Sequence, residues 1–179
     1  SYQDKYMFTA GVRREGSSKF GKDNKWGYFP AVTAGWRISE ENFMENIPVI
    51  SDLKLRFGYG ITGNQGIQEY VSLEKLSSGG MMLYNGQWIA GYSPSSNPNP
   101  NLRWEKKAEM NIGVDLGMLD NRLTINLDLY NRKTTDLLYE YTVPVPPNLY
   151  STLWTNVGEI TNKGVELAIS VVPLRNTHI

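Results

Sequence analysis

The sequence predicts an all-β fold in which antiparallel up-and-down strands form part of the wall of a large transmembrane β-barrel. Apolar and polar residues alternate with the period of two that belongs to strands, not with the period of 3.6 that belongs to helices. The connections between the alternating segments differ in length in the way that outer-membrane barrels show. Glycine and aromatic residues are abundant, with 17 Gly, 11 Tyr and 5 Trp among 179 residues, which favours strands.

Three segments alternate most clearly, and two of them predict a hairpin. They span residues 53–62, 108–118 and 123–132. The tight connection Leu119-Asp120-Asn121 joins the second segment to the third, and Asp and Asn are residues that turns prefer. The apolar residues on one face of these segments are Leu53, Leu55, Phe57, Tyr59 and Ile61, then Ala108, Met110, Ile112, Val114, Leu116 and Met118, then Leu123, Ile125, Leu127 and Leu129.

Weaker alternation in three further segments completes a set of six strands. These segments are Tyr6–Arg13, Tyr28–Ile38 and Val165–Val171. Pro30 has no N–H to give to a sheet ladder, so we expect it near the end of its strand or at a bulge. The only helical candidate is Ser39–Asn46, which Ser39 can cap and which we expect to form one or two turns.

The connections between the predicted strands alternate in length. Residues 15–25, 63–103 and 135–155 form long connections, residues 39–52 an intermediate one and residues 119–121 a short one. Outer-membrane barrels combine short turns on the periplasmic side with long loops outside. A soluble sandwich has no such requirement, so this pattern favours the membrane wall.

The composition of the two faces separates a membrane wall from a soluble sheet. The central residues of the apolar face carry no charge, as hydrocarbon requires, since a Lys or Arg at the bilayer midplane costs about 2–4 kcal/mol. Lys106 is the exception, at the loop end of its strand. Aromatic residues near strand ends, namely Tyr6, Tyr28, Trp36 and Trp104, fit the belts found at membrane interfaces. The side chains that we expect to face the barrel lumen are Arg56, Glu109, Asp115, Asp128 and Arg132.

Glycines are concentrated on the polar face. They are Gly11, Gly35, Gly58, Gly60, Gly113, Gly117 and Gly164. Glycine weakens a strand and is usually retained where another group approaches the backbone closely. A plug domain that fills the lumen would be such a group. Relief of curvature in a twisted sheet is the alternative, and the pattern does not separate the two.

The composition also argues against nucleic-acid binding and against catalysis. The 18 Lys and Arg balance the 18 Asp and Glu, so no net field attracts nucleic acid. The absence of Cys removes thiolate nucleophiles and thiolate metal sites. The single histidine, His178, has no partners for a metal site or a triad, and the adjacent Glu40 and Glu41 diverge instead of facing each other as glycosidase carboxylates do. We predict no catalytic residue, no metal and no cofactor.

Several blocks, taken in order along the chain, resemble the TonB-dependent transporters of the SusC/RagA type. The first runs from Arg13-Arg14-Glu15-Gly16 to Phe20-Gly21 and is followed by Asn24-Lys25-Trp26-Gly27-Tyr28-Phe29-Pro30-Ala31 and Gly35-Trp36-Arg37-Ile38-Ser39-Glu40-Glu41. Later blocks are Leu53-Lys54-Leu55-Arg56, Tyr59-Gly60-Ile61-Thr62-Gly63-Asn64-Gln65, Asn99-Pro100-Asn101-Leu102-Arg103-Trp104-Glu105, Asp120-Asn121-Arg122-Leu123, Asp128-Leu129-Tyr130, Thr135-Asp136-Leu137-Leu138 and Asn156-Val157-Gly158-Glu159-Ile160-Thr161-Asn162-Lys163-Gly164-Val165-Glu166. The resemblance covers nearly the whole chain.

The resemblance implies a barrel of about 22 strands in the outer membrane of a Gram-negative bacterium. It implies import of nutrients such as oligosaccharides or peptides. It also implies a plug, a segment that contacts the TonB complex, a SusD-like surface lipoprotein as partner, and contact with outer-membrane lipid. We expect residues 1–179 to be one partial barrel domain that lacks the plug and is cut at both ends, because the start has no signal-peptide pattern and Arg175–Ile179 is not a closing strand.

The long connections carry aromatic residues that are candidates for contact with a substrate or a partner. They are Trp26, Tyr84, Trp88, Tyr92, Tyr150 and Trp154. Aromatic faces stack on sugars and on peptide side chains, but these residues would also pack loops against one another or against the lipoprotein. The alternative for the whole chain is a soluble, secreted β-sandwich that binds carbohydrate through these aromatics. A need for detergent would distinguish the barrel from the sandwich.

Overall fold

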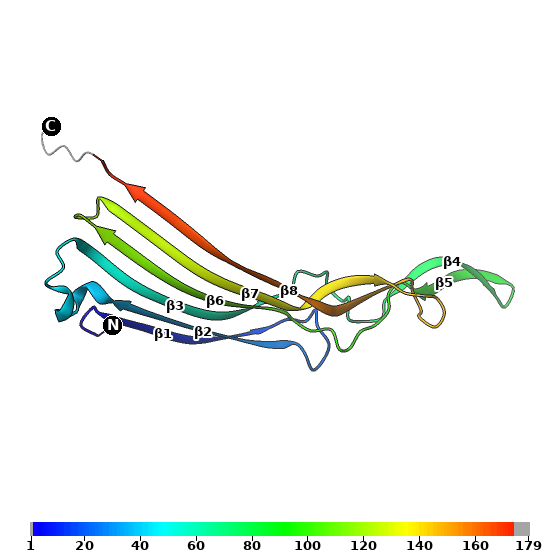
Figure 1. Ribbon diagram of the computed structural model, residues 1–179. Coiled ribbons are helices and arrows are strands. Elements are labelled where there is room, and N and C mark those ends of the chain that lie inside the picture. The colour runs from blue at the N-terminus through cyan, green and yellow to red at the C-terminus, as the bar shows by residue number, and fades with distance from the viewer. Residues whose placement is uncertain (1, 174–179) are drawn as a thin grey trace, which may run out of the picture.

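The computed structural model describes residues 2–173 and consists almost entirely of antiparallel strands (Figure 1). One sheet has the strand order β1-β2-β3-β6-β7-β8, and a separate two-stranded sheet pairs β4 with β5. The predicted all-β, up-and-down architecture is confirmed. The bounds are β1 Tyr6–Gly16, β2 Trp26–Arg37, β3 Ile50–Asn64, β4 Leu76–Tyr84, β5 Gln87–Pro94, β6 Glu105–Met118, β7 Leu123–Thr142 and β8 Thr152–Val171.

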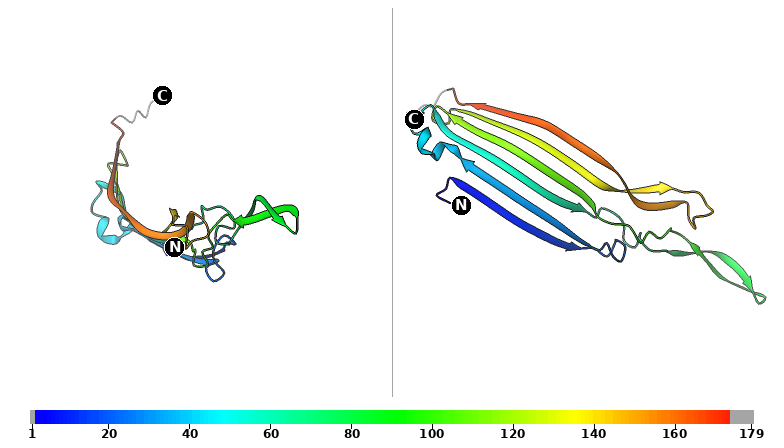
Figure 2. Two further views of the ribbon diagram at one scale, coloured as in Figure 1. Left: turned by 90° about the vertical axis from the view of Figure 1, so that its right-hand side faces the viewer. Right: turned by 60° about the horizontal axis from the view of Figure 1, so that its bottom comes forward.

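The six-stranded sheet is a single curved layer. Figure 2 shows its strands side by side, bending together as one arc, and the β4–β5 hairpin extends away from one end without covering either face. Within residues 2–173, β1 and β8 each have one neighbouring strand only, so both are edges. No helix in this part of the chain has the length and apolar character needed to cross a bilayer.

The strand register brings the alternating apolar side chains of the predicted strands to one face, because residues that pair across antiparallel strands point the same way. Phe57 of β3, for example, pairs with Ala34 on one side and with Ile112 on the other. We call this surface the apolar face and the opposite one the polar face. One row across the apolar face is Phe8-Ala34-Phe57-Ile112-Leu129-Val165, and the next is Tyr6-Trp36-Leu55-Val114-Leu127-Leu167.

The apolar side chains of this face form a band across the six strands, which we call the apolar band. This band is slanted with respect to the rows. In β1 the apolar run continues four positions beyond the first row, to Val12, whereas in β8 it ends in that row at Val165. At the other edge the relation is reversed, because β8 continues four positions beyond the second row, to Val171, and β1 ends at Tyr6. Both borders of the apolar band are therefore displaced by four positions between β1 and β8.

The connections lie at two opposite ends of the sheet. Residues 17–25, 65–104 and 143–151 form the loop end, and residues 38–49 and 119–122 form the turn end. The predicted length difference holds for 65–104 and 119–122. It is wrong for the others, because 38–49 is longer than 17–25, and β7 and β8 each extend to 20 residues and leave only 143–151 between them. The long connection also contains the β4–β5 hairpin, which the sequence analysis treated as loop.

Three local predictions meet different outcomes. The connection Leu119-Asp120-Asn121 turns as expected, with φ of 55°, 54° and 60°. The helical candidate is two 3₁₀ turns, Ile38–Glu40 and Asn42–Met44, and Ser39 does not cap them; its hydroxyl instead bonds Asp52 Oδ1 at 3.2 Å. Pro30 lies inside β2 and pairs with Val12 without a bulge, while the ladder with β3 starts one residue later. The predictions for His178 and for Arg175–Ile179 lie outside the described residues.

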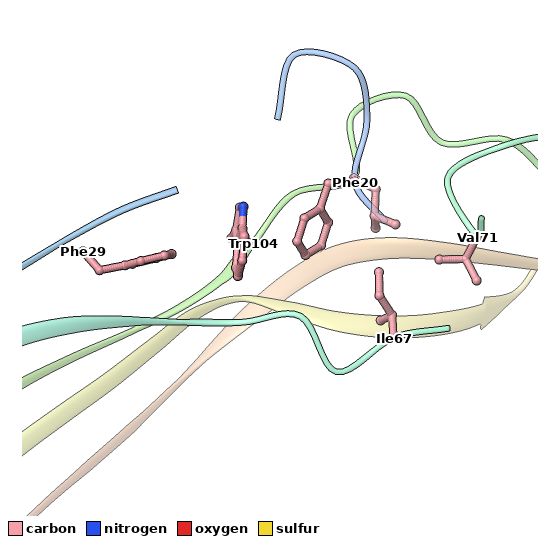
Figure 3. Packing of buried hydrophobic residues seen from close by; sticks show 6 residues of the cluster. Phe20, Phe29, Ile67, Val71 and Trp104 are labelled. Carbon is pink, nitrogen blue, oxygen red and sulfur yellow. The ribbon is translucent and has the colours of Figure 1, made fainter. Parts of the chain in front are cut away.

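The buried core lies at the loop end, not within the sheet (Figure 3). The fully buried side chains there include Phe20 and Leu102, and Trp104 is 2% exposed. The Trp104 ring packs at 5.0 Å from Phe20 and edge-on at 5.3 Å from Phe29, measured between ring centroids. Trp104 is therefore a core residue, and its predicted place in an interfacial belt is wrong. The cluster consists of Phe20, Phe29, Ile67, Val71, Leu102 and Trp104.

Candidate functional surface

The polar face carries a three-residue ion cluster in the middle of the sheet. Arg56 of β3 binds Asp115 of β6 through two nitrogens, at 2.7 Å and 2.8 Å. Its Nη2 also lies 3.1 Å from both carboxylate oxygens of Asp128 in β7. A side chain from each of three consecutive strands thus meets at one point. Bidentate pairing of this kind fixes geometry as well as charge.

Gly113 makes room for this cluster. A Cβ at position 113 would lie 2.6 Å from Arg56 Nη2 and 2.6 Å from Asp128 Oδ1. Gly164 has the same relation to Tyr130, whose hydroxyl oxygen would be 2.7 Å from an added Cβ. The close approach predicted for the polar-face glycines therefore comes, at these two positions, from side chains of the neighbouring strand. At Gly58, by contrast, no atom lies within 4 Å of an added Cβ, so the choice between plug contact and curvature stays open there.

The other two residues that the sequence analysis assigned to the lumen form a second cluster on the same face. Arg132 of β7 and Glu109 of β6 are cross-strand partners and form an ion pair at 3.0 Å. Lys107 approaches the same carboxylate at 3.4 Å, and the Arg132 guanidinium lies over the Tyr130 ring at 4.7 Å. All five predicted residues therefore lie on one face in two ion clusters. That this face lines a lumen stays a prediction.

Two asparagine side chains, neither of them among the predicted site residues, hold the loop end together. Asn97 is 6% exposed. Its Nδ2 donates to the carbonyls of Tyr150 at 2.6 Å and Thr152 at 2.8 Å, and its Oδ1 accepts from the amides of Leu149 and Tyr150. Asn156 of β8 donates to the carbonyl of Arg103 at 2.7 Å and accepts from its amide at 2.9 Å. These bonds join the segment before β6 to the β7–β8 connection.

The motif blocks Asn99-Pro100-Asn101-Leu102-Arg103 and Asn156-Val157-Gly158 contain part of this network, and they are the sequence signal from which it could have been found. The Asn99 amide donates to the Trp154 carbonyl at 2.8 Å. Arg103 completes the network with an ion pair to Asp136 at 2.7 Å. The hydrogen bond to Asp136 raises the pKa of Arg103, so the guanidinium stays charged over the whole physiological range.

The predicted loop aromatics separate into three groups. Tyr150 and Trp154 line one open depression of about 200 Å³ together with Gln68, Lys75 and Glu140. Trp154 also packs against the buried cluster. These two residues come from the start of β8 and the connection before it, and they are the pair that the structure brings together.

The other aromatics lie apart from that depression. Tyr84, Trp88 and Tyr92 lie on the β4–β5 hairpin and are 65–69% exposed. Trp26 is the first residue of β2 instead of a loop residue, and the guanidinium of Arg14 lies 4.1 Å from its ring centroid. The six aromatics thus form no single binding surface.

The hairpin has an unusual composition for an exposed element. No charged residue occurs between Leu76 and Leu102. Leu83 pairs with Trp88 on one side of the hairpin and Met82 with Ile89 on the other, and all four side chains are at least 40% exposed. A two-stranded sheet with both sides apolar buries neither of them on its own.

At the turn end, Glu41 forms a polar cluster with side chains of β1 and β2. The carboxylate of Glu41 accepts hydrogen bonds from the Tyr6 hydroxyl at 2.5 Å and from the Trp36 indole at 2.9 Å, and Lys5 Nζ lies 3.8 Å away. The bond from Tyr6, followed by the bond from Trp36, lowers the pKa of Glu41 below its ordinary value. Among residues 2–173 no group of three or more His, Cys, Asp and Glu side chains has the geometry of a metal site.

Comparison with known proteins identifies relatives along nearly the whole chain. The family model described as "TonB dependent receptor-like, beta-barrel" matches residues 1–175. The TonB-dependent receptor P39 of Formosa agariphila is 42% identical over 176 residues, covering 98% of this chain and 16% of that protein. The TonB-dependent receptor SusC of Bacteroides thetaiotaomicron is 41% identical over 177 residues, covering 97% of this chain and 18% of that protein. The chain thus spans less than a fifth of each relative.

Solved structures also resemble this chain. The RagAB peptide importer in its closed-closed state superposes with a TM-score of 0.82 at 31% identity, over 97% of this chain and 18% of that one. The open-open state of the same importer gives a TM-score of 0.84 at 30% identity, over 99% of this chain and 19% of that one. The fold of this chain is therefore found in solved structures of that importer.

Proposed function

Because the chain belongs to the TonB-dependent receptor-like β-barrel family, we propose that it forms part of the barrel wall of an outer-membrane transporter in a Gram-negative bacterium. The observation that carries this proposal is the division between the two faces. A continuous apolar surface runs across all six strands, and no described element covers it. Hydrocarbon is the environment that such a surface requires.

In this arrangement the apolar face contacts outer-membrane lipid and the polar face lines the lumen. The ion clusters around Arg56 and Arg132 then face the plug and the transported molecule. The alternative of a soluble, secreted β-sandwich that binds carbohydrate has less support, because a sandwich needs a second sheet packed on the apolar face. Within residues 2–173 the only other sheet is the projecting β4–β5 hairpin.

The transported molecules are nutrients such as oligosaccharides or peptides. The chain's own residues bind and guide such a cargo and perform no covalent chemistry. Energy from the TonB complex acts through parts of the receptor outside residues 1–179. Tyr150 and Trp154, which share one depression with Lys75 and Glu140, are the candidates for direct contact with cargo at the loop end.

The β4–β5 hairpin is the candidate surface for a SusD-like lipoprotein. Its exposed Leu83 and Trp88 and its lack of charge suit a protein partner better than a sugar, because apolar anchors dominate protein interfaces. A Leu83→Ser and Trp88→Ser double variant is expected to lose co-purification with the lipoprotein, while Gln87→Ser retains it. Loss of cargo affinity with intact co-purification would assign the hairpin to cargo instead.

Adjacent residues on opposite faces test the membrane placement. The chain contains no Cys, so single cysteines can be introduced into a cysteine-free form of the complete receptor. Ile112→Cys and Leu127→Cys are expected to resist a water-soluble maleimide and, once labelled with a membrane-permeable fluorescent maleimide, to be quenched by nitroxide-labelled lipid. Asn111→Cys and Asn126→Cys are expected to react with the maleimide and to escape the lipid quencher. Equal behaviour of the two sets would contradict the proposal.

A further inference from the structure

A row of cationic side chains borders the apolar face at the loop end, and we propose that it binds the phosphate groups of lipid headgroups. The row consists of Arg14, Lys106, Lys133 and Lys163, and we call it the cation row. The proposal rests on the membrane placement of the apolar face given above. It adds a ligand class and named residues to that placement.

The register places these four side chains on the apolar face. Arg14 pairs with Tyr28, two positions beyond the pair of Val12 and Pro30. Lys106 lies two positions before Ala108, which pairs with Ile61. Positions two apart in a strand share a face, so both cations continue the apolar side of their strands.

The other two cations follow the same rule. Lys133 pairs with Ala108, and Lys163 pairs with Asn131, the residue two positions after Leu129. On β1, β6 and β8 the cation is the first residue of this face beyond the apolar run, and on β7 it is the second. The apolar run thus ends directly at a positive charge on three of the six strands, and on β7 Asn131 lies between the run and Lys133.

The two ends of the cation row, Arg14 and Lys163, have the same slant as the apolar band, whereas Lys106 lies as far beyond the first row as Arg14 does. Lys163 lies in a row with Asn131, Met110, Tyr59, Val32 and Ala10. Arg14 is four positions beyond Ala10, which is the displacement found for both edges of the band. If the band is level in a bilayer, Arg14 and Lys163 therefore lie at one depth, just outside the hydrocarbon. That is the depth of the headgroups.

The row is open to a ligand. All four side chains belong to exposed residues. Among residues 2–173, Lys106 and Lys163 have no ion-pair partner within 4.0 Å, whereas Lys133 contacts Glu159 at 2.8 Å. Arg14 is held by the Trp26 ring, at 4.1 Å, and by the Tyr28 ring, at 5.6 Å. Stacked guanidinium groups keep their N–H donors free for an anion at the edge.

The turn end of the apolar face lacks this feature. The residues of this face that follow β6 and precede β7 are Asp120 and Asn121, and β8 is followed by Pro173. Along β6, β7 and β8 the apolar face is therefore bordered by cations at the loop end and not at the turn end. Ammonium and guanidinium groups bind phosphate through charge-assisted hydrogen bonds, and clustered cations at a membrane surface recognise anionic headgroups. A phosphate-bearing lipid in the leaflet at the loop end fits both the charge and the depth.

Matched variants of the complete receptor test the proposal. Arg14→Gln with Lys106→Gln removes two members of the cation row, and Arg13→Gln with Lys107→Gln removes the neighbouring cations of the polar face. Each receptor is placed in phosphatidylcholine nanodiscs that contain monophosphoryl lipid A or the same lipid without its phosphate. Native mass spectrometry then measures the lipid that remains bound after release.

The unaltered receptor is expected to retain the phosphorylated lipid in preference to the dephosphorylated one. The first double variant is expected to lose about fivefold of this preference for each cation, roughly 25-fold in total, and the second to keep it. Equal loss in both variants, no loss in either, or displacement of the lipid by inorganic phosphate alone would overturn the proposal. Failure of the unaltered receptor to enter the nanodiscs would instead contradict the membrane placement.

Discussion

At the scale of single residues, the loop end depends on side chains that replace regular strand pairing. Asn97 satisfies two carbonyls and two amides in a connection that has no ladder of its own. Asparagine suits this position because its amide group carries both donors and acceptors. Leucine or aspartate would each leave part of the backbone unpaired.

Asn97→Ala is expected to destabilise the β7–β8 connection by about 1–3 kcal/mol, because buried backbone groups lose their partners. Hydrogen exchange of the complete receptor is the measurement, and the amides of Leu149 and Tyr150 should exchange faster than in the unaltered protein. Asn101→Ala, at an exposed position of the same segment, is the control. Unchanged protection in Asn97→Ala would show that water replaces the side chain.

Gly21→Ala is expected to destabilise the buried cluster by about 1–3 kcal/mol, the usual cost of overpacking. A Cβ at this position would lie 1.7 Å from the carbonyl oxygen of Pro100, so the backbone itself must move. Gly58→Ala, where the added carbon meets nothing within 4 Å, is the matched control. Urea unfolding of the complete receptor distinguishes them, and equal midpoints would refute the expected clash.

Acid is expected to loosen the turn end through Glu41. The pKa of this carboxyl is lowered from 4.5 in the folded protein, so its contribution to stability is complete above that value and is lost as the pH falls through the lowered pKa. Hydrogen exchange of residues 38–49, followed from neutral pH to below 4.5, measures the effect. Glu41→Gln should remove this pH dependence, and a persistent dependence in that variant would assign it to another group.

At the scale of elements, the β4–β5 hairpin is independent of the sheet. Its base is closed by the amide of Ser95, which donates to the Lys75 carbonyl at 2.8 Å, and by Ser96, whose hydroxyl bonds the Lys75 amide and the Leu73 carbonyl. Its strands pair only with each other. The hairpin is therefore an appendage on a rigid base.

Replacement of residues 78–92 by an Asn-Gly turn is expected to change the free energy of unfolding of the complete receptor by no more than about 0.5 kcal/mol. The reason is that neither the buried cluster nor the six-stranded sheet contacts the removed strands through pairing. Thermal unfolding in detergent measures it. A large fall in the midpoint would mean that the hairpin supports the wall.

The strands that the sequence predicted alternate between apolar and polar residues. The elements that it missed do not alternate. Segments 53–62, 108–118 and 123–129 alternate strictly because hydrocarbon and water demand opposite side chains on their two faces. The β4–β5 hairpin is apolar on both sides, so Met81-Met82-Leu83 shows no period of two. The parts of β7 and β8 that extend past β6 also lose the alternation, because Leu137 and Leu138 are consecutive.

At the candidate site too, the sequence could predict only part of the arrangement. The ion clusters and the asparagine network show this. Alternation placed Arg56, Asp115 and Asp128 on one face, but only the register brings them to one point. Asn97 gave no signal of its own, because its partners are backbone atoms of residues 149–152, far along the chain. Pairing between distant segments is not encoded in any local pattern.

At the scale of the whole molecule, the sheet is one layer with most of its apolar surface uncovered. Phe8 and Val12 in β1 and Val165 to Val171 in β8 are 59–70% exposed in this chain. Both edge strands present unpaired backbone groups as well. In the proposed membrane wall, lipid covers the apolar face and further strands pair with the two edges.

The chain expressed alone is expected to aggregate in plain buffer and to require detergent for solubility. Exposed strand edges and a continuous apolar face are the two causes. Size-exclusion chromatography with and without detergent is the measurement. A stable monomer in plain buffer would contradict the membrane wall and would favour the soluble sandwich.

The slant of the apolar band also gives the inclination of the strands in the closed barrel. A displacement of four residues across the five steps from β1 to β8 corresponds to about 13 Å along the strands and about 24 Å across them. The resulting inclination is roughly 30°, close to the tilt of about 35–45° at which strands close into barrels. Tilt and stagger determine the shear of a barrel. Six strands thus already prescribe how every further strand must be offset before the first and last can meet.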